Sequence, residues 1–146
     1  MKYIAAGVIG LTAFSLTAHA GLYTDDLSRC LVEKTSKEDR ASLVRWMFAA
    51  AAAHPAVAPI AKVSMEQQDG ANKAVGELFT RLLTGSCKEK AKNAITYEGA
   101  AAIQMSFQVL GQVAGSELFQ SPEVARVMAG LEKHVDKKKL DALGKQ

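Results

Sequence analysis

The chain has 146 residues, of which 49% are apolar, 6% are aromatic and 23% are charged, and its formal net charge is +3. This composition excludes a collagen-like chain, a disordered chain and a membrane protein with many spans. The charge is too small for a protein that coats nucleic acid. The length fits a single domain, and none of these values names a function.

The N-terminal segment has the pattern of a bacterial secretory signal peptide. Lys2 provides the positive start, residues 4–17 form a short apolar stretch, and Ala18-His19-Ala20 fits an A-x-A cleavage site. We therefore predict that residues 1–20 are cleaved between Ala20 and Gly21, and that the mature protein resides in the periplasm or is secreted.

An uncleaved anchor and a lipoprotein are the two alternatives for this region. The apolar run ends in small residues, which favours cleavage over an anchor. The sequence Leu27-Ser28-Arg29-Cys30 resembles a lipobox, but Arg29 stands where a small residue is needed. No later segment is long and apolar enough to cross a bilayer. We expect residues 21–146 to form one helical domain with a polar, basic C-terminal tail and no transmembrane segment.

Both cysteines, Cys30 and Cys87, belong to the mature chain, and an even number in an exported protein predicts a disulfide. The bond would close a loop of roughly 58 residues and contribute about 4 kcal/mol in the chain-entropy model. A redox role would favour a C-x-x-C spacing, which the chain lacks. His54 and His134 do not stand at the spacing of a zinc finger with these cysteines. A structural cross-link is therefore predicted.

Helix signals recur along the mature chain, and strand signals are nearly absent. Asp25 or Asp26 can cap the first helix. Pro55 ends the second helix and begins a stiff connector that runs to Pro59. From the apolar spacing we predict helices over about 26–35, 36–54, 64–84, 87–97, 99–118 and 122–135. Further start signals are the capping boxes Thr35–Glu38, Ser64–Gln67 and Ser86–Glu89, and the sequence Ser121-Pro122-Glu123.

Apolar residues at helical spacing define the predicted core, and the same spacing continues into the last helix. The predicted inward residues are Leu27, Leu31, Leu43, Val44, Met47, Phe48, Ala51, Ala71, Val75, Leu78, Phe79, Leu82, Leu83, Ile103, Phe107, Leu110, Val113, Val124, Val127, Met128, Leu131 and Val135. The predicted fold is all-α: a single compact bundle of five to six helices, in which one disulfide ties the first helix to the start of the fourth.

A catalytic constellation is hard to assemble from this sequence. A hydrolase needs a nucleophile, a base and an orienting group, and the only mature histidines are His54 and His134. The acidic pairs Asp25-Asp26 and Glu38-Asp39 stand at predicted helix starts, where the helix dipole favours acids. We therefore predict no catalytic residue and no metal site.

Cofactor and nucleic-acid binding have equally weak signals. A covalent haem needs C-x-x-C-H, which is missing, and Met47 with His134 is only a loose pair of axial ligands. Lys88, Lys90 and Lys92 alternate in sequence and do not form a stripe along a helix. We predict no cofactor and no nucleic-acid partner.

Two features are candidates for contact with a protein partner. Trp46 is the only tryptophan, and this residue type is enriched in interface hot spots, although a place at the edge of the core is the simpler interpretation. His54, Pro55 and Pro59 form a connector whose two prolines would reduce the ordering cost of binding. The alternative for His54 is a structural role at the helix end.

The pattern as a whole resembles small periplasmic immunity proteins, in particular the helical families that neutralise cell-wall amidase toxins of type VI secretion. The resemblance is carried by Cys30 and Cys87, by the helix around residues 43–48, and by the His54-Pro55 connector. It is architectural and includes no specific motif. It implies a protein without enzymatic activity that binds a toxin or envelope hydrolase and occludes its active-site cleft, often as a homodimer.

Two other functions remain open. A periplasmic chaperone or envelope-stress bundle would present an exposed apolar concave face, but the L-T-x-x-Q repeat of the known small chaperones of this kind is absent. A cofactor carrier or enzyme is the third alternative.

Overall fold

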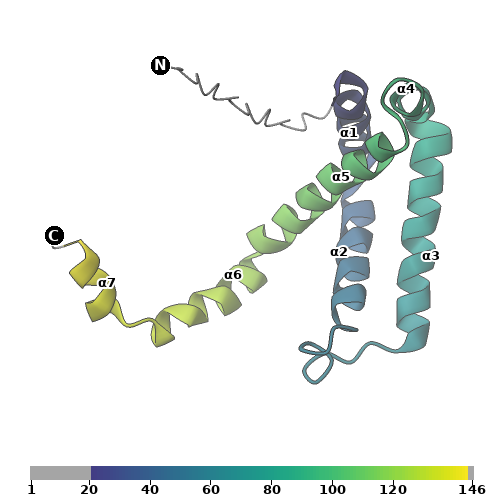
Figure 1. The fold of residues 1–146 in the computed structure, drawn as a ribbon. Helices are drawn as coiled ribbons and strands as arrows, with labels where there is room; N and C mark the ends of the chain where they lie inside the picture. The colour runs from purple at the N-terminus through teal and green to yellow at the C-terminus, as the bar shows by residue number, and fades with distance from the viewer. Residues whose placement is uncertain (1–20, 145–146) are drawn as a thin grey trace, which may run out of the picture.

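The computed structural model describes residues 21–144, so the predicted signal peptide lies outside the described residues (Figure 1). Between Gly21 and Gly144 the chain forms helices and turns without a β strand. None of these helices combines the length and apolar character needed to span a membrane. The helices are α1 (Leu22–Lys34), α2 (Lys37–Ala51), α3 (Met65–Arg81), α4 (Lys88–Glu98), α5 (Ala101–Gln120), α6 (Pro122–Ala129) and α7 (Lys137–Leu143).

Helices α1 to α5 form the body of the molecule. α1 packs against α4 and α5, and α2 packs against α3 and α5, so that α5 bridges the two halves (Figure 1). α2 and α3 run side by side in opposite directions and are joined by residues 52–64, which we call the connector from here on. The buried apolar side chains are Leu27, Leu31, Leu43, Val75, Leu78, Leu82, Ala91, Ala94, Ala102, Leu110 and Ala114. The predicted all-α fold is confirmed. Of the residues predicted to point inward in this part of the chain, the leucines at 27, 31, 43, 78, 82 and 110 and Val75 are buried, whereas Phe48 and Ala51 are exposed.

The predicted disulfide is present. Cys30 in α1 is bonded to Cys87 directly before α4, with 5.9 Å between their Cα atoms, and Cys87 is buried. The chain reaches Cys87 through a π-helical turn, Leu82–Ser86, which widens the end of α3. Gly85 lies inside this turn. Cys87 itself is the N-cap of α4 without a side-chain cap, so the third predicted capping box is wrong.

The other helix starts follow the expected chemistry with two corrections. Ser64 and Gln67 form the predicted capping box of α3. The box of α2 lies one residue later than predicted, with Ser36 and Asp39 bonding reciprocally. α1 starts at Leu22 with Gly21 as its N-cap, and neither aspartate that follows caps it. A carboxylate from the end of α4 takes that role, as described below.

Buried polar groups in the contact between α1 and α5 all have partners. The carbonyl oxygen of Thr24 accepts hydrogen bonds from the Ser28 hydroxyl at 2.7 Å and from the Ser106 hydroxyl at 3.1 Å. All three residues are buried. Because a buried hydroxyl without a partner is costly, the bond from Ser106 favours this arrangement of α5 on α1.

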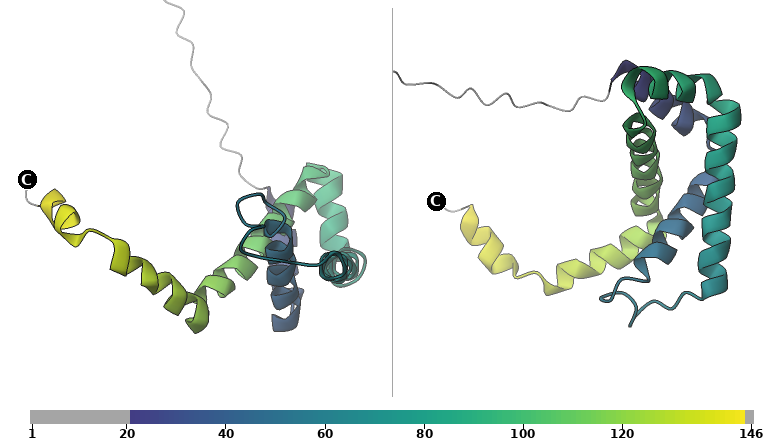
Figure 2. Two further views of the ribbon diagram at one scale, coloured as in Figure 1. Left: turned by 90° about the horizontal axis from the view of Figure 1, so that it is seen from below. Right: turned by 45° about the vertical axis from the view of Figure 1, so that its right-hand side comes forward.

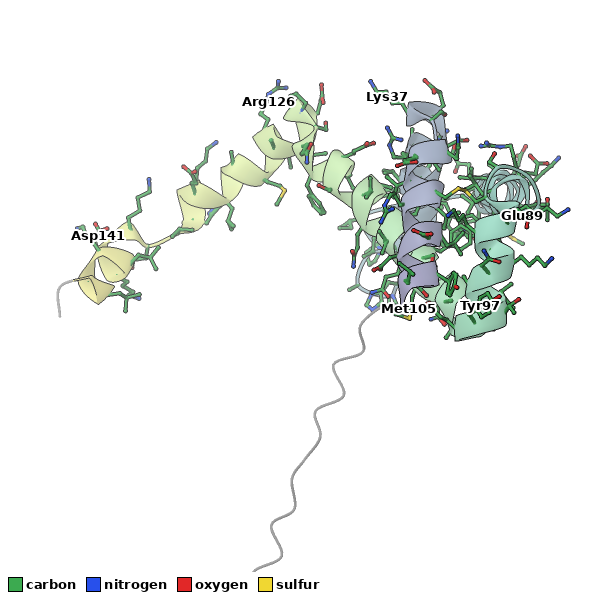
Figure 3. The ribbon with its side chains drawn as sticks, turned by 90° about the horizontal axis from the view of Figure 1, so that it is seen from above. Lys37, Glu89, Tyr97, Met105, Arg126 and Asp141 are labelled. Atoms are coloured by element: carbon green, nitrogen blue, oxygen red, sulfur yellow. A yellow bond between two sulfur atoms is a disulfide. The ribbon has the colours of Figure 1, made fainter. Side chains whose placement is uncertain are left out.

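The C-terminal arm, residues 122–144, differs from the prediction. It consists of α6, a 3₁₀ turn (Gly130–His134) and α7, and it leads away from the body (Figures 1 and 2). Arg126 lies in the first helix of the arm and Asp141 near its far end, away from Tyr97 and Met105 in the body (Figure 3). No residue of α6 or α7 is buried. The fold is therefore a compact body with a projecting arm, not one compact bundle.

The end of the arm is helical where a polar tail was expected. The Asp136 side chain accepts a hydrogen bond from the backbone N–H of Lys139 at 3.2 Å and so caps α7. This helix raises the number of α-helices in the described chain to seven, above the five to six predicted. A local cap outweighed the polar composition from which the tail was predicted.

Candidate functional site

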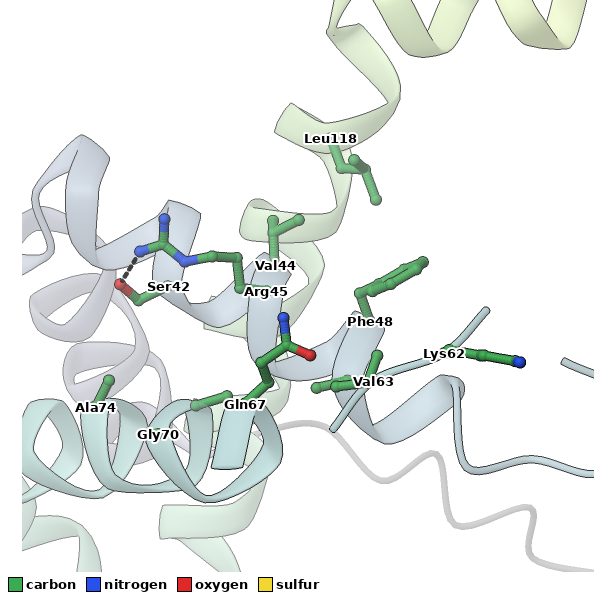
Figure 4. A pocket seen from close by; sticks show the side chains of 12 residues that line it. Ser42, Val44, Arg45, Phe48, Lys62, Val63, Gln67, Gly70, Ala74 and Leu118 are labelled. Carbon is green, nitrogen blue, oxygen red and sulfur yellow. Dashed lines mark hydrogen bonds between the residues drawn. The ribbon is translucent and has the colours of Figure 1, made fainter. Parts of the chain in front are cut away.

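An open groove of about 710 Å³ lies between the C-terminal half of α2 and the N-terminal half of α3 (Figure 4). The end of α5 and the last residues of the connector complete its walls. The lining residues are Ser42, Val44, Arg45, Phe48, Ala49, Lys62, Val63, Gln67, Gly70, Ala71, Ala74 and Leu118. We call this feature the α2–α3 groove.

The apolar side chains of the groove are of two sizes. Phe48 and Val44 project from α2, and Leu118 faces them from the last turn of α5 (Figure 4). On α3 the groove is lined by Gly70, Ala71 and Ala74, which stand at helical spacing and let another chain approach the backbone closely. Phe48 is 58% exposed. The surface is thus apolar, concave and accessible.

The ionisable side chains in the groove are both basic. Arg45 donates a hydrogen bond to the Ser42 hydroxyl at 2.9 Å, and Lys62 extends from the connector (Figure 4). Among the described residues neither cation has a carboxylate within ion-pair distance. The groove therefore favours an apolar ligand that carries acidic groups along its edge.

Trp46 lies in a smaller hollow of about 320 Å³ next to the groove, which shares Ala49 with it. Its indole Nε1 donates a hydrogen bond to the side-chain oxygen of Asn72 in α3 at 2.9 Å, and the ring is partly buried. This bond joins α2 to α3. The observed contacts of Trp46 are those of a residue at the edge of the core.

His54, Pro55 and Pro59 lie exposed on the connector and do not line the groove. The Nδ1 atom of His54 accepts a hydrogen bond from the backbone N–H of Ala56 at 3.2 Å. Its carbonyl accepts from the two residues after Ala56, at 2.8 and 2.9 Å. His54 thus shapes the turn after α2. The predicted partner-binding residues are not brought together, because Trp46 sits in the separate hollow.

One carboxylate of each acidic pair, Asp26 and Asp39, makes structural contacts. Lys90 donates a hydrogen bond to Asp26 at 2.9 Å, and this bond lowers the pKa of the Asp26 carboxyl. Burial raises the pKa of Asp39, but hydrogen bonds from Ser36 and Arg81 outweigh it and leave the pKa below its usual value. Within residues 21–144 no three His, Cys, Asp or Glu side chains are grouped so that they could hold a metal ion.

The groove itself was not predicted from the sequence. Phe48 and Ala71 were assigned to the core, whereas Phe48 is mostly exposed and Ala71 only partly buried. Apolar spacing cannot distinguish a covered face from an open one, and α2 contacts only α3 and α5. The small residues Gly70, Ala71 and Ala74 were the available signal, because they mark a helix face that another backbone can approach.

No family model matches the sequence, and neither a curated protein nor a solved structure matches it. The resemblance to immunity proteins therefore stays a prediction. The geometry of the α2–α3 groove is the basis for a proposal about function.

Proposed function

We propose that this protein is an exported helical binding protein that holds a helix of another polypeptide in the α2–α3 groove. We further propose that its partner is a toxin or cell-wall hydrolase, whose active site it occludes as the immunity proteins that it resembles do. The observation that carries the proposal is the open apolar groove, whose lining includes an exposed aromatic side chain, Phe48.

The dimensions and lining of the groove support a helical ligand. The groove is open and mostly apolar along its length, with a volume of about 710 Å³. An amphipathic helix can place its apolar face against Val44, Phe48 and Leu118, while the small residues of α3 accept its backbone. Arg45 and Lys62 would pair with acids beside that apolar face.

The chemistry of the groove supports binding rather than catalysis. Arg45 and Lys62 are its only ionisable residues, and neither stands next to a nucleophile with a base. The cross-link between Cys30 and Cys87 supports export, because such bonds persist in oxidising compartments. The A-x-A sequence before Gly21 supports the periplasm as the location of the mature protein.

The arm supports a second candidate function, that of a chaperone. The apolar residues of the arm are exposed: Val127 is 80% exposed, Leu131 68% and Met128 56%. Exposed apolar surfaces of this kind bind unfolded chains or partner proteins. The same residues could join two copies in a homodimer, so the oligomeric state should be measured along with binding.

The proposal is tested by capturing partners on the tagged mature protein. Envelope extracts of the source strain and of competing kin are passed over it, and bound proteins are identified by mass spectrometry. One stoichiometric hydrolase or other effector is the expected result. A broad set of unfolded envelope proteins would instead favour the chaperone.

Variants of the groove then locate the interface. Phe48→Ala should weaken binding of the captured partner by at least about tenfold, the loss typical of a hot-spot residue, without lowering thermal stability. Leu22→Ala is the matched control, because Leu22 is a large apolar residue that is 71% exposed on α1. Equal binding by the wild type and by Phe48→Ala would show that the groove is not the interface.

A further inference from the structure

The first turn of α1 depends on a carboxylate from a distant part of the chain. Glu98, the last residue of α4, accepts hydrogen bonds from the backbone N–H groups of Tyr23 and Thr24, both at 2.9 Å. It also accepts one from the Thr24 hydroxyl at 2.6 Å. These are the N–H groups that a side chain at Gly21, the N-cap, would normally satisfy.

Glycine at position 21 is what lets this carboxylate enter. A Cβ atom built on Gly21 would overlap the carboxylate of Glu98. The backbone nitrogen of Gly21 is two bonds from that Cβ position, which places it within about 5 Å of the carboxylate. The residue predicted to begin the mature chain thus lies against an acidic side chain.

We infer that Glu98 is a binding site for the primary ammonium group that signal-peptide cleavage creates on Gly21. Hydrolysis of the peptide bond between Ala20 and Gly21 leaves a carboxylate on Ala20 and an ammonium group on Gly21. Before cleavage this nitrogen belongs to a neutral amide, so the ion pair forms only in the processed protein. The inference rests on the export step of the proposed function and not on the partner.

Glu98 is the nearby carboxylate that compensates the charge of this ammonium group at the positive end of α1. The N-terminus of a helix carries a positive partial charge, which disfavours a cation there unless an anion compensates. On α1 the nearest ionisable side chains are Tyr23 and Asp25, and Asp25 is exposed. α4 contributes Glu98 and Tyr97, whose ring stacks on that of Tyr23 at 4.7 Å between centroids. α5 has no ionisable residue before Glu117.

The pair links processing to the stability of the fold. It would attach the new N-terminus to α4, close to the contact of α1 with α4. Because the pair raises the pKa of the α-amino group, its stabilisation is fully present below the unfolded pKa of about 8. It is lost as the pH rises through the folded pKa. The processed chain should therefore hold the start of α1 more firmly than the precursor at neutral pH.

The test is an NMR titration of the Gly21 α-amino group. The full chain is expressed with export, and the intact mass of the purified protein identifies its first residue. Wild type is compared with Glu98→Gln, which keeps a side-chain acceptor without the charge. Glu89→Gln is the control, because Glu89 is an exposed acid in the first turn of α4.

We expect the pKa of the α-amino group to be about half a unit or more higher in wild type than in Glu98→Gln, as a Coulomb interaction over this distance predicts. Glu89→Gln should match wild type. If Glu98→Gln fails to fold, the wild-type pKa should fall in about 1 M salt, which screens the pair. If the protein is cleaved at Gly21 but neither the Glu98→Gln substitution nor salt lowers the pKa of the α-amino group, this inference is overturned and the export proposal stays intact. An unprocessed chain, or one processed elsewhere, would overturn the inference together with the predicted cleavage site.

Discussion

The body and the arm both have apolar residues at helical spacing, but these residues are covered by other helices in the body and exposed in the arm. In the body, Leu27 in α1, Leu82 in the π-helical turn after α3 and Leu110 in α5 are fully buried, because each of these segments packs against other helices of the body. In the arm, Val127 and Leu131 stand at the same spacing and are mostly exposed. Helical periodicity thus specifies an amphipathic helix, while burial depends on which helix the rest of the chain brings to it.

The largest expected difference between the two regions comes from the disulfide, which acts only on the body. Replacing Cys30 and Cys87 together by alanine should lower the free energy of unfolding by about 4 kcal/mol, because the unfolded chain regains the entropy of the closed loop. Urea denaturation checks the value. A reducing agent should destabilise wild type and leave the double variant unchanged.

The same leucine-to-alanine substitution can be compared directly in the two regions. Leu110→Ala, at a fully buried position in α5, should cost about 3 kcal/mol through lost burial and the cavity that remains. The same change at Leu131, which is 68% exposed on the arm, should alter the free energy of unfolding by about 0.5 kcal/mol or less. Similar losses at both sites would mean that the arm packs on a core in solution.

Acid should weaken the body through its capping carboxylates. Hydrogen bonds lower the pKa of Glu98 and of Asp39, in Asp39 against an opposing effect of burial. Groups with a depressed pKa stabilise the fold above their unfolded pKa, and this contribution is lost as the pH falls through the folded pKa. We therefore expect the melting temperature to decline once the pH drops below about 4. The melting temperature of Asp39→Asn should be lower than that of wild type at neutral pH, and the difference between the two should become smaller in acid.

The smallest expected effect is that of removing the arm. A chain that stops after Ser121 should unfold with a free energy within about 0.5 kcal/mol of wild type, because no residue of α6 or α7 is buried. Calorimetry on both proteins gives the comparison. A loss above about 1 kcal/mol would show contacts between arm and body that this structure does not contain.

Local sequence patterns predicted much of this fold, whereas contacts between residues far apart in the sequence were not predicted. The Ser64 capping box, Pro122 at the first position of α6 and the cross-link at Cys87 were all predicted from neighbouring residues or from cysteine count. The cap on α1 comes from Glu98, which is 75 residues from Tyr23 in sequence, and no local pattern indicates it.

The candidate site was harder to predict than the fold. The groove exists because α5 crosses α2 and leaves Phe48 uncovered, and periodicity does not encode such a crossing. Trp46 was predicted from its residue type, and the His54 connector from the stiffness of its two prolines. They turned out to occupy a separate hollow and an exposed turn.

The position of the disulfide in the chain has a mechanical consequence. Cys30 and Cys87 are 57 residues apart, and α2, the connector and α3 all lie between them. A force applied to the two ends of the oxidised chain passes from α1 to α4 through the sulfur atoms. It therefore bypasses both helical walls of the groove, and only Leu118 of the groove residues lies on the loaded path. Such a protein can be pulled at its ends while the α2–α3 groove stays folded.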